Sequence, residues 1–170
     1  MKRYIHRHLP MPVWRFIPVA GIGAFLAVLV LGAISQYGSL PLLIAPFGAS
    51  CVLLFAAHSS PLSQPVNVVG GHVVAALVGV ACHFIWPGQF VMAAAAIGVA
   101  IMAMMMLRVV HPPAGATALV AYLTATSWLF IIFPVLVGSI VLVGLALVYH
   151  QVTDNIYPLH HPDHLHRLKK

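Results

Sequence analysis

The stretch HPPAGATAL at residues 111–119 decides how the rest of the chain is interpreted. Two consecutive prolines cannot donate backbone hydrogen bonds, so they suit the first turn of a helix and disrupt its middle. We therefore expect a helix that begins at this proline pair and runs to about residue 126. First-turn N–H groups have no partner inside a helix and lie at the positive end of its dipole. Because Gly115 and Ala116 leave these groups uncovered and Thr117 adds a hydroxyl, the helix start is a candidate anion site.

A second copy of this pattern lies earlier in the chain. Residues 46–52 read PFGASCV and residues 113–119 read PAGATAL, so proline, glycine and alanine coincide at an offset of 67 residues. At the same offset Ser50 corresponds to Thr117. Internal repeats whose broken helices meet near the middle of the bilayer are found in transporters. We prefer this interpretation to the alternative, in which the prolines only kink spanning helices that pack through small residues.

The composition is that of a membrane protein with several spans. The 170 residues are 62% hydrophobic and only 6% charged, and the mean hydropathy is +1.03. Both acidic residues, Asp154 and Asp163, lie near the C-terminus, so the expected membrane region holds no carboxylate of the kind that often couples transport to protons or sodium. The net charge of +6 comes from the two ends and Arg108. This distribution indicates membrane topology and argues against nucleic-acid binding.

The predicted fold class is an all-α membrane protein with a single membrane domain over residues 16–150. A basic N-terminal collar at residues 1–15 precedes this domain, and a His-rich basic tail at residues 151–170 follows it. The domain holds six apolar segments, which we expect to form two three-helix repeats at residues 16–86 and 90–150.

The middle segment of each repeat, at about 40–57 and 112–126, is short or broken by proline. If all six segments cross the bilayer with a cytoplasmic N-terminus, all eight Lys and Arg residues lie on one side. With two re-entrant segments instead, Arg108 would lie on the opposite side. We therefore predict six crossings and two cytoplasmic termini in a bacterial inner membrane. Repeats with an odd number of helices are then inverted, and the two proline-led helix N-termini are paired at one site.

The motif HPPAGA at residues 111–116 resembles the signature of the HPP family of integral membrane proteins. Three further motifs similar to that family follow its order: APFGAS at 45–50, SPLSQP at 60–65 and NVVGGH at 67–72. The likeness covers about residues 16–158. It implies a membrane fold that is usually described with four spans and, from members in cyanobacteria and chloroplasts, nitrite transport. The chain departs from the pattern at Val66, where a basic residue is expected, and so lacks a cation that would attract an anion there.

The candidate substrate-binding residues lie in the two repeated motifs and in the third apolar segment. They are Pro46, Gly48, Ala49, Ser50, Asn67, His72, His111, Pro112, Pro113, Gly115, Ala116 and Thr117. A protonated His111 pairs with an anion, and ionisable groups such as His72 inside a membrane usually face a cavity or a partner. The plainer alternatives are a histidine at the membrane interface, a helix cap at Asn67, and hydroxyls that bond to their own helix.

The leading hypothesis is a transporter or channel for a small anion such as nitrite, in a lipid bilayer, with no cofactor and no bound metal. The alternatives are a histidine-based metal or proton-coupled carrier and a sensor or scaffold that transports nothing. We expect no enzyme, because a nucleophile such as Ser50 or Thr117 beside His72 would have no acid to orient the base. We interpret the tail histidines as solvated. A homo-oligomer is compatible with the helix faces rich in Gly and Ala.

Overall fold

A computed structural model describes residues 11–125 and 127–159, and within these residues the chain is helical, with no strand. The main helices are α1 Phe16–Tyr37, α2 Ala45–Cys51, α3 Pro65–Ile85, α4 Phe90–Met106, α5 Pro112–Thr124 and α6 Val137–Val152. Shorter helical pieces are η2 Val52–Ala56, η3 Pro61–Ser63 and η4 Ile131–Leu136. The predicted all-α class is confirmed, and the predicted segments agree with these helices to within a few residues at each end.

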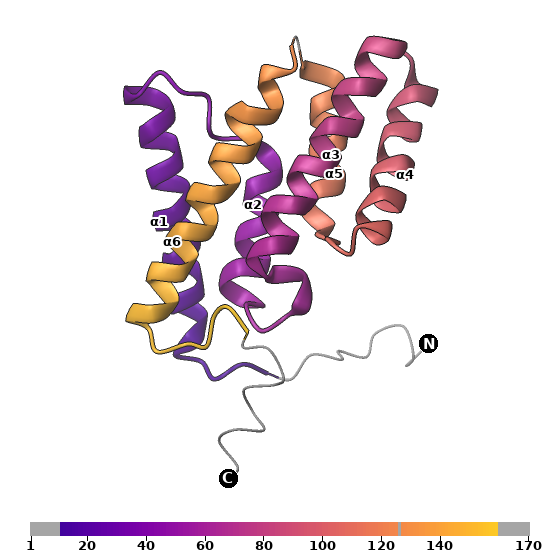
Figure 1. Cartoon of the computed structure of the whole chain (residues 1–170). Helices are drawn as coiled ribbons and strands as arrows, with labels where there is room; N and C mark the ends of the chain where they lie inside the picture. Colours follow the sequence, from indigo (N-terminus) through magenta and orange to yellow (C-terminus); the bar gives the residue numbers. More distant parts are fainter. Residues whose placement is uncertain (1–10, 126, 160–170) are drawn as a thin grey trace, which may run out of the picture.

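The helices stand side by side and alternate in direction (Figure 1). α1 begins and α6 ends on the same side of the molecule, the lower side in the figure. α1 packs against α6 and α2, whereas α3 packs against α4 and α5. α2 also contacts α5 and so joins the two groups of helices.

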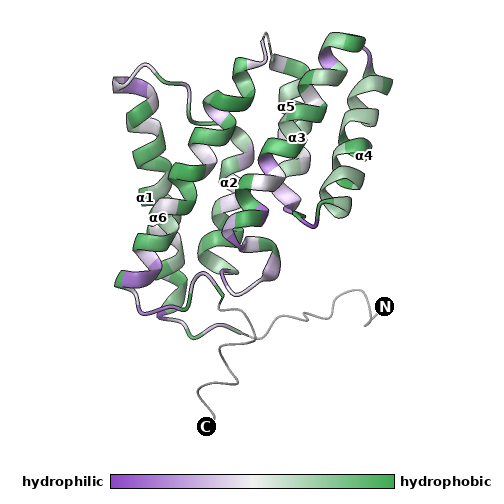
Figure 2. Cartoon of the chain, in the orientation of Figure 1, coloured by the Kyte–Doolittle hydropathy of each residue, from purple (hydrophilic) through white to green (hydrophobic). Residues whose placement is uncertain are grey.

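Among the residues that the structure describes, three helices are long and apolar enough to cross a bilayer: Phe16–Tyr37, Pro65–Ile85 and Ile131–Val152, the last formed by η4 and α6 together. Figure 2 shows hydrophobic residues along most of the helical length, with hydrophilic residues mainly near helix ends and connections. α5 has only 13 residues, which rise about 20 Å, whereas the hydrocarbon core is about 30 Å thick. A non-helical stretch precedes each of the short helices α2 and α5, and α2 continues into η2.

Side chains satisfy the backbone of these non-helical stretches. Before α2, the Ser35 hydroxyl accepts hydrogen bonds from the N–H groups of Leu42 and Leu43, at 2.9 and 3.1 Å. Before α5, the Asn67 side-chain amide donates to the Val110 carbonyl at 2.9 Å. Unpaired backbone groups are costly in lipid, so these bonds make irregular chain tolerable inside the protein.

α4 ends in a Schellman motif that turns the chain toward α5. The Arg108 N–H donates to the Met105 carbonyl at 3.1 Å, and the Val109 N–H donates to the Met104 carbonyl at 2.9 Å. The motif needs a left-handed residue, a place that glycine usually fills, and Arg108 occupies it with a φ of 59°. Its side chain is exposed. Arg108, the basic residue in the middle of the sequence, thus forms the turn that leads to His111.

Small residues let α3 and α5 approach closely. Gly71, Ala75 and Gly79 recur every four residues on α3 and are buried. A β-carbon at Gly79 would collide with the Ala118 carbonyl and lie 2.8 Å from the Ala121 β-carbon. Lipid is as apolar as these helices, so close packing of small residues holds them together.

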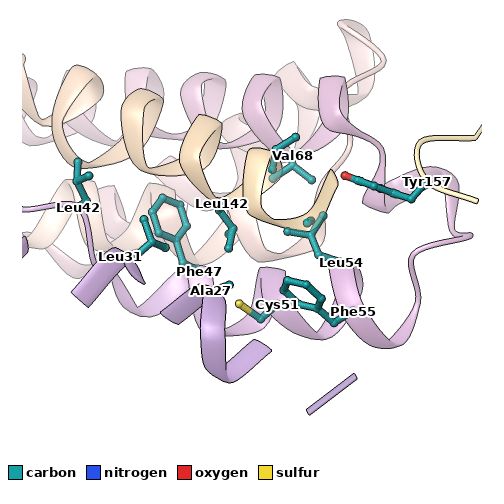
Figure 3. Close-up of a cluster of buried hydrophobic side chains, with 12 residues drawn as sticks. Ala27, Leu31, Leu42, Phe47, Cys51, Leu54, Phe55, Val68, Leu142 and Tyr157 are labelled. Atoms are coloured by element: carbon teal, nitrogen blue, oxygen red, sulfur yellow. The ribbon is translucent and has the colours of Figure 1, made fainter. Parts of the chain in front are cut away.

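A larger hydrophobic cluster fills the space between α1, α2 and α6 (Figure 3). Phe47, Leu31 and Leu142 are fully buried in it. A β-carbon at Gly138 would lie 2.6 Å from the Phe47 ring and 2.9 Å from the Leu42 carbonyl oxygen. Phe47 therefore fixes α2 against α6, and its ring also lies edge-on to the His72 imidazole of α3, with ring centroids 5.1 Å apart.

Candidate functional site

Four polar side chains with no exposed surface meet where α2, α3 and α5 pack together. They are Ser50, His72, His111 and Thr117, each 0% exposed, and we call them the polar cluster. Ser50 lies near the end of α2, His72 in α3 and Thr117 in α5, while His111 is the residue that precedes α5. All four were among the candidates from the sequence.

The Ser50 hydroxyl is the centre of the polar cluster. Nε2 of His72 and Nε2 of His111 each lie 2.9 Å from Ser50 Oγ. Nδ1 of His72 lies 2.7 Å from the Thr117 hydroxyl, and Nδ1 of His111 lies 2.9 Å from the Leu62 carbonyl oxygen. Every ring nitrogen of the two imidazoles therefore has a hydrogen-bond partner.

The proline pair explains why His111 reaches into the polar cluster. The residue before a proline avoids the helical region, and His111 is extended, with φ −136° and ψ 106°. The chain therefore changes direction at His111, and its imidazole extends toward α2 and the η3 turn instead of joining the surface of α5. Asn67 supports this position by binding the carbonyl of the preceding residue, Val110.

The donors of the polar cluster are side chains, which corrects the expectation of uncovered backbone amides. Pro112 and Pro113 have no N–H, and the Ala114 N–H donates to the His111 carbonyl at 2.9 Å. At the start of α2, the Phe47 N–H donates to the Ile44 carbonyl at 3.0 Å. These two N–H groups thus donate within their own first turns.

The other candidates from the sequence fall into two groups. Pro46 and Pro113 are buried, and the Pro46 carbonyl lies 3.3 Å from Ser50 Oγ. The rest lie outside the polar cluster: Gly48, Ala49, Pro112 and Ala116 are exposed, and Gly115 is half-buried. Val66 is 64% exposed, so a basic residue at this position would face away from the polar cluster.

A cavity of about 650 Å³ lies on the opposite face of α2 and η2. Gly48, Cys51, Val52 and Phe55 line it, at a spacing that places them on one helical face. Ser50 lies on the other face, so α2 separates the cavity from the polar cluster. The remaining lining is largely apolar and comes mainly from α1, with His58 from the turn after η2 and His150 from α6.

Two features of this region were missed from the sequence. The Leu62 carbonyl, which holds His111, comes from a backbone atom that no motif marks. His58 and His150 lie with ring centroids 4.6 Å apart, and burial together with this neighbour lowers the pKa of His58 below its ordinary value.

In residues 11–125 and 127–159, no three His, Cys, Asp or Glu side chains are placed to hold a metal ion. The tail histidines from residue 160 onward lie outside the described residues.

Comparison with known proteins finds a transmembrane family and transmembrane relatives. Residues 10–158 match the family model described as the HPP transmembrane region. One transmembrane protein of Dictyostelium discoideum is 33% identical over 164 residues, covering 89% of this chain and 58% of the relative. Another is 35% identical over 142 residues, covering 76% and 46%.

The chain thus spans about half the length of the curated relatives it matches. No solved structure matches it. The family match covers all the described helices and includes both proline-led motifs. The chain belongs to the HPP transmembrane family, and it is an integral membrane protein.

Proposed function

We propose that the protein transports a small anion such as nitrite and that the polar cluster is the substrate contact. The observation that carries the proposal is the convergence of two Nε2 atoms, from His72 and His111, on the single oxygen of Ser50. A substrate oxygen that displaced this hydroxyl would meet two imidazole nitrogens at once. Buried ionisable groups in membrane proteins are costly and usually functional.

The chemistry of the polar cluster favours an anion over a cation. Its side chains are hydroxyls and imidazoles, and an imidazole becomes positive when it is protonated. Asp154, the acidic residue within the described chain, follows α6 at its end. A cationic substrate would therefore meet no counter-charge in the polar cluster.

The proposal includes six crossings and two inverted repeats, and paired contacts support it. A β-carbon at Gly71 would lie 2.9 Å from the Val109 carbonyl oxygen, and one at Gly138 would lie 2.9 Å from the Leu42 carbonyl oxygen. The offset of 67 residues relates Gly71 to Gly138 and Leu42 to Val109. Each repeat thus packs its third helix on the stretch that precedes the short helix of the other repeat. Such equivalent contacts are expected for two repeats related by a pseudo-two-fold axis.

We further propose a carrier that opens by movement of one repeat against the other. Supporting this, the polar cluster is fully buried, and a partition one helix thick, α2, separates it from the nearby cavity. Access therefore requires displacement of α2 or of the η3 turn.

We keep as proposals a bacterial inner membrane, two cytoplasmic termini and a homo-oligomer. We also keep the prediction that there is no enzyme activity, because a carbonyl and a hydroxyl, and no carboxylate, orient the two imidazoles.

The test is uptake of nitrite and nitrate by liposomes that contain the full chain, with protein-free liposomes as the blank. We expect Ser50→Ala and Thr117→Ala to reduce the uptake rate by about tenfold, the equivalent of about 1.4 kcal/mol for a lost hydrogen bond. Ser139→Ala is the matched control, because Ser139 is equally buried but its hydroxyl donates only to the Leu136 carbonyl.

Absence of protein-dependent flux for any small monovalent anion would overturn the proposed function. Flux that instead requires a divalent metal, and that is lost in His72→Gln and His111→Gln, would favour the metal carrier.

A further inference from the structure

We infer that the polar cluster is a directional proton wire, and that it couples the entry of each anion to the uptake of one proton. This inference rests on the transport function proposed above. Its basis is a chain of four hydrogen bonds whose proton positions are fixed by one backbone carbonyl. The bonds link Thr117, His72, Ser50, His111 and Leu62 in that order.

The proton assignment begins at Leu62. A carbonyl oxygen accepts hydrogen bonds and never donates them, so Nδ1 of His111 carries a proton and donates to the Leu62 carbonyl at 2.9 Å. A neutral imidazole has one N–H, so Nε2 of His111 is then a bare acceptor. The group facing it, at 2.9 Å, is the Ser50 hydroxyl, which must donate.

The same counting of protons assigns the donors of the other two hydrogen bonds, between Ser50 and His72 and between His72 and Thr117. Ser50 has one hydroxyl proton, and His111 takes it in preference to the Pro46 carbonyl at 3.3 Å, because a buried ring nitrogen would otherwise have no donor. Ser50 Oγ therefore accepts from Nε2–H of His72 at 2.9 Å. Nδ1 of His72 is then bare and accepts the Thr117 hydroxyl proton at 2.7 Å. All four bonds run in one direction.

A proton that arrives at Thr117 can be relayed along this wire, and each of the four hydrogen bonds is present both before and after the relay. The Thr117 oxygen takes the incoming proton and passes its own to Nδ1 of His72. Nε2 of His72 then releases its proton to Ser50 Oγ, and Ser50 passes its proton to Nε2 of His111. His72, Ser50 and Thr117 end neutral, and His111 ends as an imidazolium that donates from both nitrogens. The three hydrogen bonds between Thr117 and His111 are then reversed, and His111 still donates to the Leu62 carbonyl.

This relay explains why an anion and a proton would enter together. In the neutral wire, Nε2 of His72 is a donor but Nε2 of His111 is an acceptor, which repels an anionic oxygen placed at Ser50. After the relay His111 is an imidazolium whose Nε2–H donates toward the substrate, while the bare Nε2 of His72 accepts the Ser50 hydroxyl proton. The polar cluster then carries one positive charge. One anion with one proton leaves the polar cluster neutral, as burial favours.

The exit for the proton is closed by the η3 turn. Nδ1 of His111 faces the Leu62 carbonyl, which cannot carry a proton onward. This turn is held by the Ser63 hydroxyl, which donates to the Ala57 carbonyl at 2.8 Å, and by the Tyr157 hydroxyl, which donates to the Ser63 carbonyl at 3.0 Å. Movement of the turn would replace Leu62 by water and release the proton. The charged and titratable groups nearby in sequence are Cys51 on the cavity face of α2 and the exposed Arg108.

The first experiment reads the tautomers directly and needs no transport activity. Ring-nitrogen NMR spectra of the full chain, labelled with ¹⁵N-histidine in lipid vesicles, are recorded at neutral pH. His72→Gln and His111→Gln variants assign the two sets of signals. We expect His111 as the Nδ1–H tautomer and His72 as the Nε2–H tautomer. The opposite tautomer at either ring overturns the wire.

The second experiment tests the coupling. Nitrate uptake and internal pH are followed together in liposomes, since nitrous acid crosses lipid unaided and would mask a coupled flux of nitrite. We expect one proton per nitrate and a rate that does not change with an imposed membrane potential. Thr117→Val should slow both fluxes by about tenfold, about 1.4 kcal/mol, whereas Thr117→Ser, which keeps the hydroxyl, should restore them.

The outcomes separate the two proposals. Nitrate uptake that depends on membrane potential and carries no proton overturns the coupling and leaves the anion transporter in place. Absence of protein-dependent flux for nitrate and for every other small monovalent anion overturns the transporter and the coupling with it, whereas the tautomers seen by NMR still test the proton wire.

Discussion

Gly79 of α3 lies directly against the carbonyl oxygen of Ala118 in α5, and no β-carbon fits between them. Gly79→Ala should therefore push the two helices apart and destabilise the protein by about 1–3 kcal/mol, the usual cost of overpacking. Thermal unfolding in detergent measures the loss. Gly144→Ala in α6 is the control, because a β-carbon there meets nothing within 4 Å. Equal melting temperatures for the two variants would contradict this account of the α3–α5 contact.

Removal of the Ser50 hydroxyl should destabilise the fold as well as reduce transport. Ser50→Ala leaves Nε2 of His72 and Nε2 of His111 without their hydrogen-bond partner, and each unsatisfied buried group costs about 1–3 kcal/mol. Ser139→Ala removes one hydroxyl from one carbonyl and should cost about 1 kcal/mol or less. Denaturant unfolding of the two variants compares them. The prediction fails if Ser139→Ala is the more damaging change.

Tyr122 secures the connection between α3 and α4. Its buried hydroxyl accepts from the Gln89 N–H at 2.7 Å and lies within hydrogen-bond distance of the Trp86 and Gln89 carbonyls, at 3.0 and 2.8 Å. Tyr122→Phe should cost about 1–3 kcal/mol, because the Gln89 N–H loses its acceptor. Hydrogen exchange at Gln89 should accelerate in the variant. Unchanged protection there would show that the hydroxyl does not hold this turn.

Arg108 occupies a backbone conformation that suits glycine. Arg108→Gly should keep the Schellman turn and raise stability by about 1 kcal/mol, since a non-glycine residue in the left-handed region is strained by about that amount. Arg108→Ala removes the same charge but keeps the strain, so it separates the two effects. Melting temperatures of both variants provide the comparison. If Arg108→Gly is the less stable of the two, the side chain contributes more than the turn does.

Acid should loosen the region around His58. Burial and the neighbouring His150 lower the pKa of His58, so the folded state binds the proton less tightly than the unfolded state. Neutral His58 therefore contributes fully to the free energy of unfolding above the ordinary histidine pKa of about 6.5. This contribution is lost as the pH falls through the lower pKa that His58 has in the folded state. His58→Gln should make unfolding less sensitive to pH in this range. A variant with the wild-type pH profile would assign the effect elsewhere.

The fold was largely predictable because hydrophobicity and proline mark the helix boundaries in this chain. The first helix was expected at residues 16–37 and is found at Phe16–Tyr37, and α3 starts at Pro65 as expected. The last helix was less well placed: its first turns, η4, include the non-helical Phe133 and the following Pro134. Local composition does not reveal such a distortion, because it depends on how the segment packs.

The candidate site was predictable in part. The four members of the polar cluster were identified because polar residues are conspicuous in an apolar sequence. The uncovered amides were not found, because a turn can close on itself, as the Ala114 N–H does with the His111 carbonyl. Small residues at the motif, such as Gly48 and Ala116, proved to be on the outside of their helices. Which side of a helix faces the interior depends on distant partners, and these are not encoded near the motif.

The hydrogen bonds of His72 also constrain how the protein is made. Its two partners come from opposite directions along the chain: Ser50 precedes it by 22 residues and Thr117 follows it by 45. Because α3 precedes α5 in the chain, α3 emerges from the ribosome first. During that interval the imidazole has half of its final partners, so the early helices have to remain loosely associated, or shielded by the insertion machinery, until the late ones arrive.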